Sequence, residues 1–289
     1  MEAHSRRSLL GAGLARLMPE QLAGAEPPAA VPTPTSAWEL GDDESLFRWL
    51  EPAAEELVDA AGVTARDHVL DVAAGDGNVA LAAARRGARV VACDIREGAV
   101  QRGRARTDAA AADVEWVQAD ALGLPFDAGT FDCVLSGFGV IYVARPRDVA
   151  GELRRVARTT GRVAVTSWGS AGFMGRALDT AWRRDSGPDR ARPSRWGRYE
   201  TLYLLFGGAT HPLEVDERAL PFGADDPAEA WELLASTPGP VGAAARTLPR
   251  SERDELRREV VEAAASVSRE AALGVPYAIT VAAAIDRSD

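Results

Sequence analysis

The chain has 289 residues, of which 46% are hydrophobic, with 43 acidic and 33 basic residues. This length suits one large α/β domain or two small ones, and the apolar content is enough for a packed core. Every basic residue is an arginine, which excludes mechanisms that use a lysine amine as base or Schiff-base nucleophile. The net charge of -10 repels phosphate backbones, so we expect no nucleic-acid partner and favour a small or neutral substrate.

The N-terminus and the two cysteines bear on the cellular compartment. Ser5–Leu10 resembles a twin-arginine export signal, but charged residues interrupt the apolar stretch that should follow it. Cys93 and Cys133 each lie in an apolar run without metal-ligand spacing, so we expect reduced core thiols, no disulfide and no metal site. We therefore predict a cytoplasmic protein in which residues 1–36 form a flexible tail and proline-rich linker, and we predict no membrane span.

The first regular pattern runs from Trp38 to Ala61, where apolar residues recur at three- and four-residue steps and predict one or two amphipathic cap helices. Short β-branched runs then alternate with helical stretches, which indicates βαβ units around a parallel sheet. Gly87 and Gly161 stand where helices should stop. Strands are predicted at His68–Val72, Arg89–Asp94, Val114–Gln118, Phe131–Ser136 and Arg162–Trp168, and helices at Asn78–Arg86, Glu97–Ala110 and Arg147–Ala157.

The pattern becomes less regular after Trp168. Ser251 and Asp254 predict a capping box at the start of a long helix. Further helices are predicted at Phe173–Arg183, Glu200–Phe206, Pro227–Leu234 and Ser251–Ser266, and further strands at Leu213–Ala219 and Tyr277–Ala283.

The loop after the first predicted strand, Asp71-Val-Ala-Ala-Gly-Asp-Gly-Asn78, carries the sharpest chemical signal. Its glycines let a ligand approach the backbone, and the helix that follows presents unpaired amides. Gly75 to Ala80 also fits the dinucleotide pattern G-x-G-x-x-G/A, so the loop alone leaves an NAD(P)-dependent oxidoreductase open. The carboxylate of Asp71 would repel a pyrophosphate but suits a ligand with an ammonium and a sulfonium, which favours S-adenosylmethionine.

A second acid lies after the third predicted strand. Asp120 can accept a hydrogen bond from the exocyclic amine of adenine, while the N–H of Ala121 can donate to a ring nitrogen. The alternative for Asp120 is a helix or turn cap. Asp94, at the end of the second predicted strand, stands at the sheet edge where open α/β folds bind ligands.

Together these segments resemble the class I S-adenosylmethionine-dependent methyltransferases, within them the small-molecule group, over roughly residues 38–284. The resemblance implies a Rossmann-like three-layer α/β/α sandwich, with a seven-stranded, mostly parallel sheet whose last strand, 277–283, is antiparallel. Relatives often have glycine at the position of Ala73 and proline and two glycines before the fifth strand, where we expect Gly161 to keep the turn. The resemblance implies cofactor contacts from Asp71, Ala73, Gly75 and Gly77 to the methionine part, from Asp94 to the ribose, from Ile95, Asp120 and Ala121 to adenine, and from Ser136 at the reaction centre.

The resemblance also implies a division of the chain and a reaction. We expect a methyltransferase domain at 37–289, with a helical cap (37–64), a cofactor-binding core (65–168), a variable substrate-covering insertion (169–210) and the rest of the sheet and helices (211–289). Methyl transfer from a sulfonium needs alignment and exclusion of water more than a base. Tyr142 is the candidate catalytic residue, and Trp38, Phe138, Tyr142 and Trp168 are the candidate substrate contacts.

Three alternatives to a small-molecule, natural-product methyltransferase stay open. One is a cyclase of a natural-product pathway that binds the cofactor without transferring its methyl group. Another is the NAD(P)-dependent oxidoreductase permitted by the glycine pattern. The third is a non-enzymatic regulatory module that senses the cofactor. We expect a monomer or homodimer whose partner is a small-molecule acceptor.

Overall fold

The computed structural model of the chain describes residue 38 and residues 43–184, 192–207, 213–224, 226–267 and 274–283. The predicted tail and linker, 1–36, lie outside the described residues. The described residues form a sheet of seven strands in the order β3-β2-β1-β4-β5-β7-β6. The strands are β1 (His68–Val72), β2 (Arg89–Asp94), β3 (Val114–Gln118), β4 (Phe131–Gly137), β5 (Ala157–Trp168), β6 (Leu213–Pro221) and β7 (Gly274–Ala283).

The strand directions confirm the predicted fold class. β7 pairs antiparallel with both β5 and β6, whereas the other pairs are parallel. The last strand is therefore inserted between the fifth and sixth, as the resemblance implied. In β1 every residue after His68 is buried, which is typical of a parallel strand with both faces covered.

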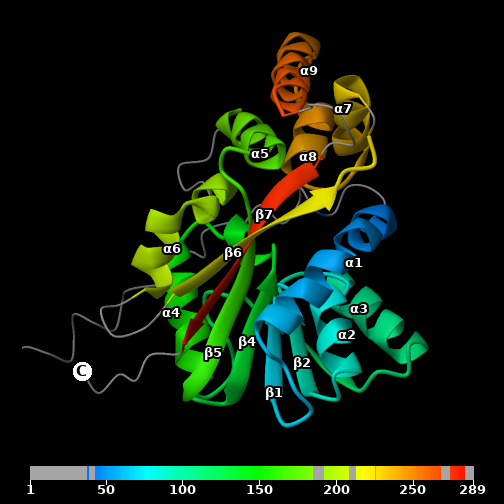
Figure 1. Cartoon of the computed structure of the whole chain (residues 1–289). Helices are drawn as coiled ribbons and strands as arrows, with labels where there is room; N and C mark the ends of the chain where they lie inside the picture. Colours follow the sequence, from blue (N-terminus) through cyan, green and yellow to red (C-terminus); the bar gives the residue numbers. More distant parts are fainter. Residues whose placement is uncertain are drawn as a thin grey trace, which may run out of the picture. The chain divides into compact units, whose positions relative to one another are not determined.

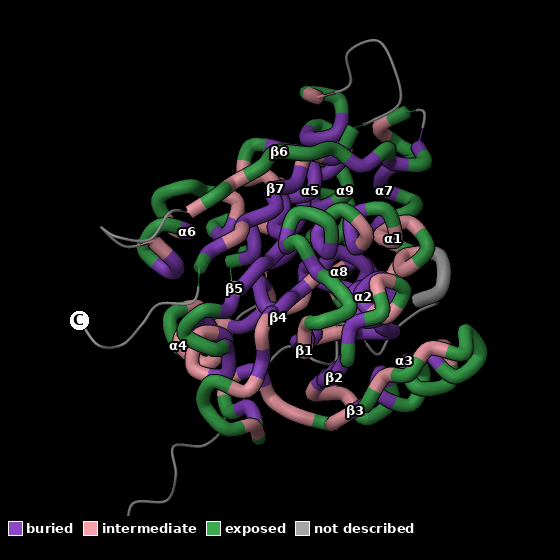
Figure 2. The backbone as a smooth tube through the Cα atoms, turned by 60° about the horizontal axis from the view of Figure 1, so that its bottom comes forward, coloured by how far each residue is buried: buried purple, intermediate pink, exposed green. Residues whose placement is uncertain are grey.

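Helices cover both faces of this sheet. Figure 1 shows α1, α2 and α3 on one side, α4 and α6 on the other, and α5, α7, α8 and α9 gathered at one end of the strands. Figure 2 shows β4, β5 and β7 largely buried, whereas β6 at one edge of the sheet and parts of the surrounding helices are exposed. The helices are α1 (Asp43–Ala60), α2 (Asn78–Arg85), α3 (Glu97–Ala109), α4 (Pro146–Val156), α5 (Phe173–Arg183), α6 (Tyr199–Phe206), α7 (Pro227–Ser236), α8 (Pro240–Thr247) and α9 (Arg250–Ala265).

Glycines were predicted to end two helices, and the structure confirms one of these two predictions. Gly87 follows the end of α2 with φ of 79°, a left-handed conformation that favours glycine, so this predicted stop is confirmed. The predicted stop and turn at Gly161 are wrong, because α4 ends at Val156 and Gly161 lies inside β5. There the pairing jumps from Phe131–Ala157 to Cys133–Arg162, so β5 bulges by several residues against β4.

At the C-terminal end one prediction is wrong and one helix was missed. The capping box of Ser251 and Asp254 does not form, because α9 begins one residue earlier, after Pro249, without a side-chain cap. The helix α8 was not predicted, because Pro238-Gly239-Pro240 has the composition of a loop. In the structure Pro240 occupies the first helical turn, where its missing N–H costs nothing.

Candidate functional site

A cavity lies at the carboxyl ends of five parallel strands, where open α/β sheets bind ligands. The space between its walls is about 1250 Å³, which includes volume open to solvent. The floor comprises Ala73–Gly75 after β1, Asp94–Arg96 at β2, Ala119–Ala121 after β3, Gly137–Gly139 at β4 and Trp168 at the end of β5. Residues of α1, α5 and α8 cover it.

The conformation of the loop after β1 depends on residues with left-handed backbone dihedral angles and on a hydrogen bond to the neighbouring strand β2. Ala73 and Gly75 have φ of 55° and 56°. An alanine in this region costs roughly 1–2 kcal/mol, so the methyl group at position 73 is accommodated with strain. The N–H of Gly75 donates to Asp94 Oδ2 over 2.9 Å, which ties the loop to β2. A Cβ at Gly75 would come within 2.8 Å of the Phe47 ring, so an alanine there would force the ring or the loop to move.

Asp71 is placed differently from the prediction. It is 1% exposed and does not line the cavity. Its Oδ2 accepts from the N–H of Ala80 over 3.0 Å, while Oδ1 is buried without a partner. Burial raises the pKa of Asp71 to about 8, so at neutral pH the group is mostly a neutral acid. Asp71 is therefore not placed as a charge that faces the ligand. Instead, its side chain fixes the start of α2, and with it the loop, through the hydrogen bond from Ala80.

Replacing Asp71 with asparagine should flatten the pH dependence of stability. A carboxyl whose pKa is raised from 3.8 to about 8 stabilises the folded protein fully at low pH, and this stabilisation is lost as the pH rises through that window. The free energy of unfolding should fall by up to about 1.4 kcal/mol per pH unit there. Urea unfolding of the parent protein and Asp71→Asn at several pH values measures this slope. Asp113→Asn, an exposed site, is the control, and equal slopes in parent and Asp71→Asn would contradict the assignment.

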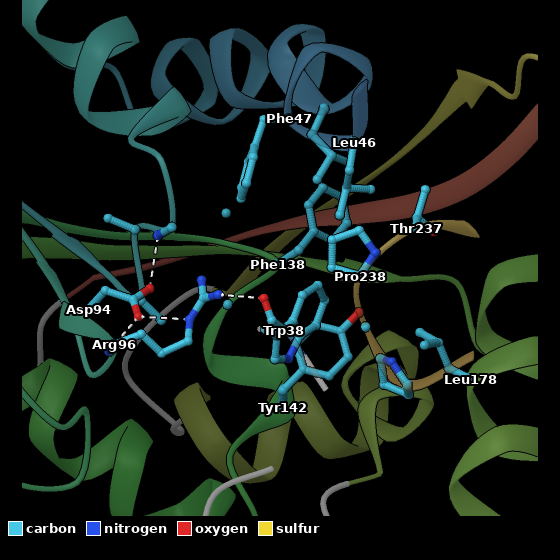
Figure 3. A pocket seen from close by; sticks show the side chains of 18 of the residues that line it. Trp38, Leu46, Phe47, Asp94, Arg96, Phe138, Tyr142, Leu178, Thr237 and Pro238 are labelled. Atoms are coloured by element: carbon cyan, nitrogen blue, oxygen red, sulfur yellow. Dashed lines mark hydrogen bonds and ion pairs between the residues drawn. The ribbon is translucent and has the colours of Figure 1, made fainter. Parts of the chain in front are cut away.

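Asp94 does line the cavity, but its carboxylate is engaged by the protein. Oδ1 accepts from the backbone N–H of Arg96 over 2.9 Å and from its Nε over 3.3 Å. The same guanidinium donates through Nη1 to the carbonyl of Trp38 over 3.0 Å (Figure 3). A chain of contacts thus runs from the loop through Asp94 and Arg96 to Trp38. The sequence gives no signal for Arg96, because only the folded chain brings residue 38 beside it.

Ile95, Asp120 and Ala121 line the same side of the cavity as Asp94. Oδ1 of Asp120 accepts from the N–H of Leu122 over 2.9 Å, so the alternative role as a turn cap is realised. This does not remove the carboxylate from the cavity, which Asp120 and Ala121 both line.

At the end of β4, Phe138 lines the cavity whereas Ser136 does not. Ser136 is fully buried; its hydroxyl donates to the carbonyl of Val72 over 2.8 Å and accepts from the N–H of Val140 over 3.1 Å. It holds β4 against β1 and is absent from the cavity lining, as is Gly77. Phe138 lines the cavity with φ of 59°, and its N–H donates to Thr166 Oγ1 over 2.9 Å.

The opposite end of the cavity is aromatic. Trp168 stacks against Phe138 at a centroid distance of 3.9 Å and against Trp49 at 5.7 Å. Its indole N–H donates to the hydroxyl of Tyr142 over 3.2 Å, and the Trp38 ring meets Tyr142 edge-on at 4.8 Å. The four predicted substrate contacts are therefore brought together. Burial raises the pKa of Tyr142 above its ordinary value, so this phenol stays protonated and cannot serve as a base near neutral pH.

A further set of contacts fastens α1 to the loop and was not predicted. Asn78 Nδ2 donates to the carbonyl of Phe47 over 2.7 Å. Arg106 on α3 donates to Asn78 Oδ1 over 2.5 Å and also pairs with Glu51 of α1. Three segments far apart in sequence meet here, and no local pattern indicates which arginine joins them.

The two cysteines lie in the hydrophobic core, as predicted. Cys93 and Cys133 are buried and unpaired. Burial raises the pKa of each thiol to about 12, so both are inert. In the described ranges, no group of three or more histidine, cysteine or acidic residues is arranged to hold a metal ion. None of the helices there is long and apolar enough to cross a bilayer.

Comparison with known proteins identifies the family. A family model described as "Methyltransferase domain" matches residues 70–165. The protein Rv1405c of Mycobacterium tuberculosis is 35% identical over 201 residues, which cover 68% of this chain and 73% of that one. The chain belongs to the class I S-adenosylmethionine-dependent methyltransferase family.

Two more comparisons extend this result. Rv1403c of Mycobacterium tuberculosis is 41% identical to this methyltransferase-family chain over 153 residues, 53% of this chain and 56% of that protein, so the match spans just over half of that relative. The crystal structure of the YcgJ protein from Bacillus subtilis aligns with a TM-score of 0.61 at 14% identity, covering 81% of this chain and 99% of that one. This likeness shows the shared fold. The methyltransferase family implies S-adenosylmethionine as the cofactor and disfavours the oxidoreductase alternative.

Proposed function

We propose that this protein transfers the methyl group of S-adenosylmethionine to a small-molecule acceptor, mainly by aligning the two and excluding water. The observation that carries the proposal is a single cavity with two chemically different ends. The end at β1, β2 and β3 presents carboxylates and loop backbone, and the end at β4 and β5 presents aromatic rings. A cofactor and an acceptor can therefore lie side by side within one cavity.

The polar end fits the hydrogen-bonding groups of S-adenosylmethionine. The ammonium, ribose hydroxyls and adenine amine of this molecule are all donors, and Asp94 and Asp120 supply acceptor oxygens in the cavity. In the proposed arrangement Asp94 binds the ribose, Asp120 and Ala121 read the adenine edge, and Ile95 covers its face. Ala73 and Gly75 hold the methionine part, while Asp71, Gly77 and Ser136 act through the loop and strands that they support.

The chain's own residues provide alignment and a dry environment. When bound, S-adenosylmethionine supplies an electrophilic methyl group on a positively charged sulfur. Phe138, Trp168 and Trp49 form an aromatic wall, in which the first two rings are buried and Trp49 is half-buried, and this wall keeps water from the acceptor. Tyr142, protonated and fixed by Trp168, orients the acceptor.

Ligand-dependent stability tests the cofactor assignment. S-adenosylhomocysteine at 100 times its Kd should stabilise the protein by about 2.7 kcal/mol, seen as a raised melting temperature, whereas NAD and NADP should not. Stabilisation by NAD or NADP alone would overturn the proposal. Incubation with methyl-labelled cofactor and a host extract then separates a methyltransferase from a cyclase, since a cyclase would leave the label on the cofactor. The cytoplasmic location, the natural-product pathway, the domain subdivision and the monomeric or dimeric state stay predictions.

A further inference from the structure

The acceptor end of the cavity offers no unpaired charge to a ligand, since Arg96, which donates to the Trp38 carbonyl, is already paired with Asp94. The charged side chains among the described lining residues are Asp94, Arg96 and Asp120, which lie at the ends of β2 and β3. Thr237 at the end of α7 donates its hydroxyl proton to the carbonyl of Leu234 over 3.1 Å. A charged acceptor group placed against the aromatic wall would therefore lose its hydration without gaining a partner there.

The aromatic wall is rigid and already satisfied. The indole N–H of Trp49 donates to the carbonyl of Pro221 over 2.6 Å, and that of Trp168 donates to the Tyr142 hydroxyl. Neither indole is left with a donor for a ligand. Trp168 is 3% exposed and held between two rings, with interplanar angles of 17° to Phe138 and 8° to Trp49. Because both faces of the Trp168 ring are covered, a flat apolar ligand would contact the outer rings and the edges of this stack, with little loss of side-chain entropy on binding.

Tyr142 supplies a polar point on this surface. Its oxygen accepts from Trp168, and burial favours the protonated phenol. No described residue accepts the phenolic proton, which is therefore available to a ligand. A protonated hydroxyl that already accepts one hydrogen bond selects a ligand atom that can accept, such as a carbonyl, ether or hydroxyl oxygen.

We propose that the acceptor is an uncharged, planar ring compound that lies along Phe138 and Trp168 and places an oxygen at the Tyr142 hydroxyl. The proposal rests on the proposed function, because it assigns this end of the cavity to the acceptor. It makes Tyr142 a specificity-determining residue for oxygen-bearing rings.

Isothermal titration calorimetry with 2-naphthol as the probe tests this, with and without S-adenosylhomocysteine. 2-Naphthoate has the same rings with a carboxylate, and it should bind at least about 10-fold more weakly because its charge is buried without a partner. Tyr142→Phe should weaken 2-naphthol about 5- to 10-fold, the usual effect of one hydrogen bond, and change S-adenosylhomocysteine affinity less than about 2-fold. Tyr203→Phe, on the exposed face of α6, is the matched control and should change neither.

The outcomes separate this inference from the proposed function. Equal binding of 2-naphthoate and 2-naphthol, or an unchanged affinity of Tyr142→Phe for 2-naphthol, would overturn the inference. So would a protein that binds S-adenosylhomocysteine and ignores 2-naphthol, and the proposed function would then stand. If S-adenosylhomocysteine fails to bind, the proposed function fails. The titration without it still measures the affinity of the aromatic end of the cavity for 2-naphthol.

Discussion

Gly139→Ala should weaken S-adenosylhomocysteine binding by about 10- to 100-fold, since overpacking costs about 1–3 kcal/mol. The added Cβ would lie 2.4 Å from the carbonyl oxygen of Ala73 and 2.6 Å from its Cβ. Gly139 has φ of -82° and tolerates alanine by itself, so the collision alone decides the outcome. Ala73 is already strained in the left-handed region, so relief requires movement of the loop or of the β4 end, both of which line the cavity.

Gly151→Ala is the matched control for this prediction. Gly151 lies within α4, and no atom lies within 4 Å of an added Cβ. The change should leave ligand affinity unaltered and raise stability by up to about 1 kcal/mol, because alanine favours helix. Calorimetric titration of both variants gives the comparison, with circular dichroism to check folding. If folded Gly139→Ala bound S-adenosylhomocysteine as the parent protein does, the contact between the loop and the β4 end would have no part in the site.

The sheet and its helices were predictable because their signals are local. Each of the first four strands appears in the structure at the expected position, and the fifth overlaps its prediction but begins earlier, at Ala157 instead of Arg162. Periodicity and β-branched content decide such elements within a few residues. The failures at Gly161 and α8 share a cause. Glycine and proline mark breaks in sequence, yet β5 absorbs Gly161 as a bulge and α8 uses Pro240 at its start.

The sequence predicted which segments form the candidate site, but it predicted the roles of the individual residues less well. The loop, Asp94, Asp120 and Phe138 meet in one cavity because parallel strands end at one edge of the sheet. Which side chain faces the ligand depends on alternation and burial that a motif does not specify, and so Asp71 and Ser136 support the cavity from outside its lining. Arg96 and Arg106 were missed because their partners lie 58 and 55 residues away.

Asp94→Ala should remove S-adenosylhomocysteine binding to below detection and lower the free energy of unfolding by about 3–5 kcal/mol, because it breaks a buried ion pair. The carboxylate accepts from Gly75 N–H, from Arg96 N–H and from the Arg96 guanidinium, whose side chain is only 14% exposed. Without it, the loop loses its tie to β2, and the buried guanidinium keeps only the Trp38 carbonyl among the described contacts.

Two further variants separate the contribution of the Asp94 charge to ligand binding from its contribution to stability. Asp94→Asn preserves volume and one acceptor oxygen, so it should fold with a smaller loss of stability, and its affinity reports what the negative charge contributes. Asp108→Ala, at an exposed position of α3, should match the parent protein in both measurements. Thermal unfolding without ligand separates collapse of the loop from loss of a ligand contact. A folded Asp94→Asn protein with parental affinity would show that the loop needs an acceptor at this position but that the charge plays no part in binding.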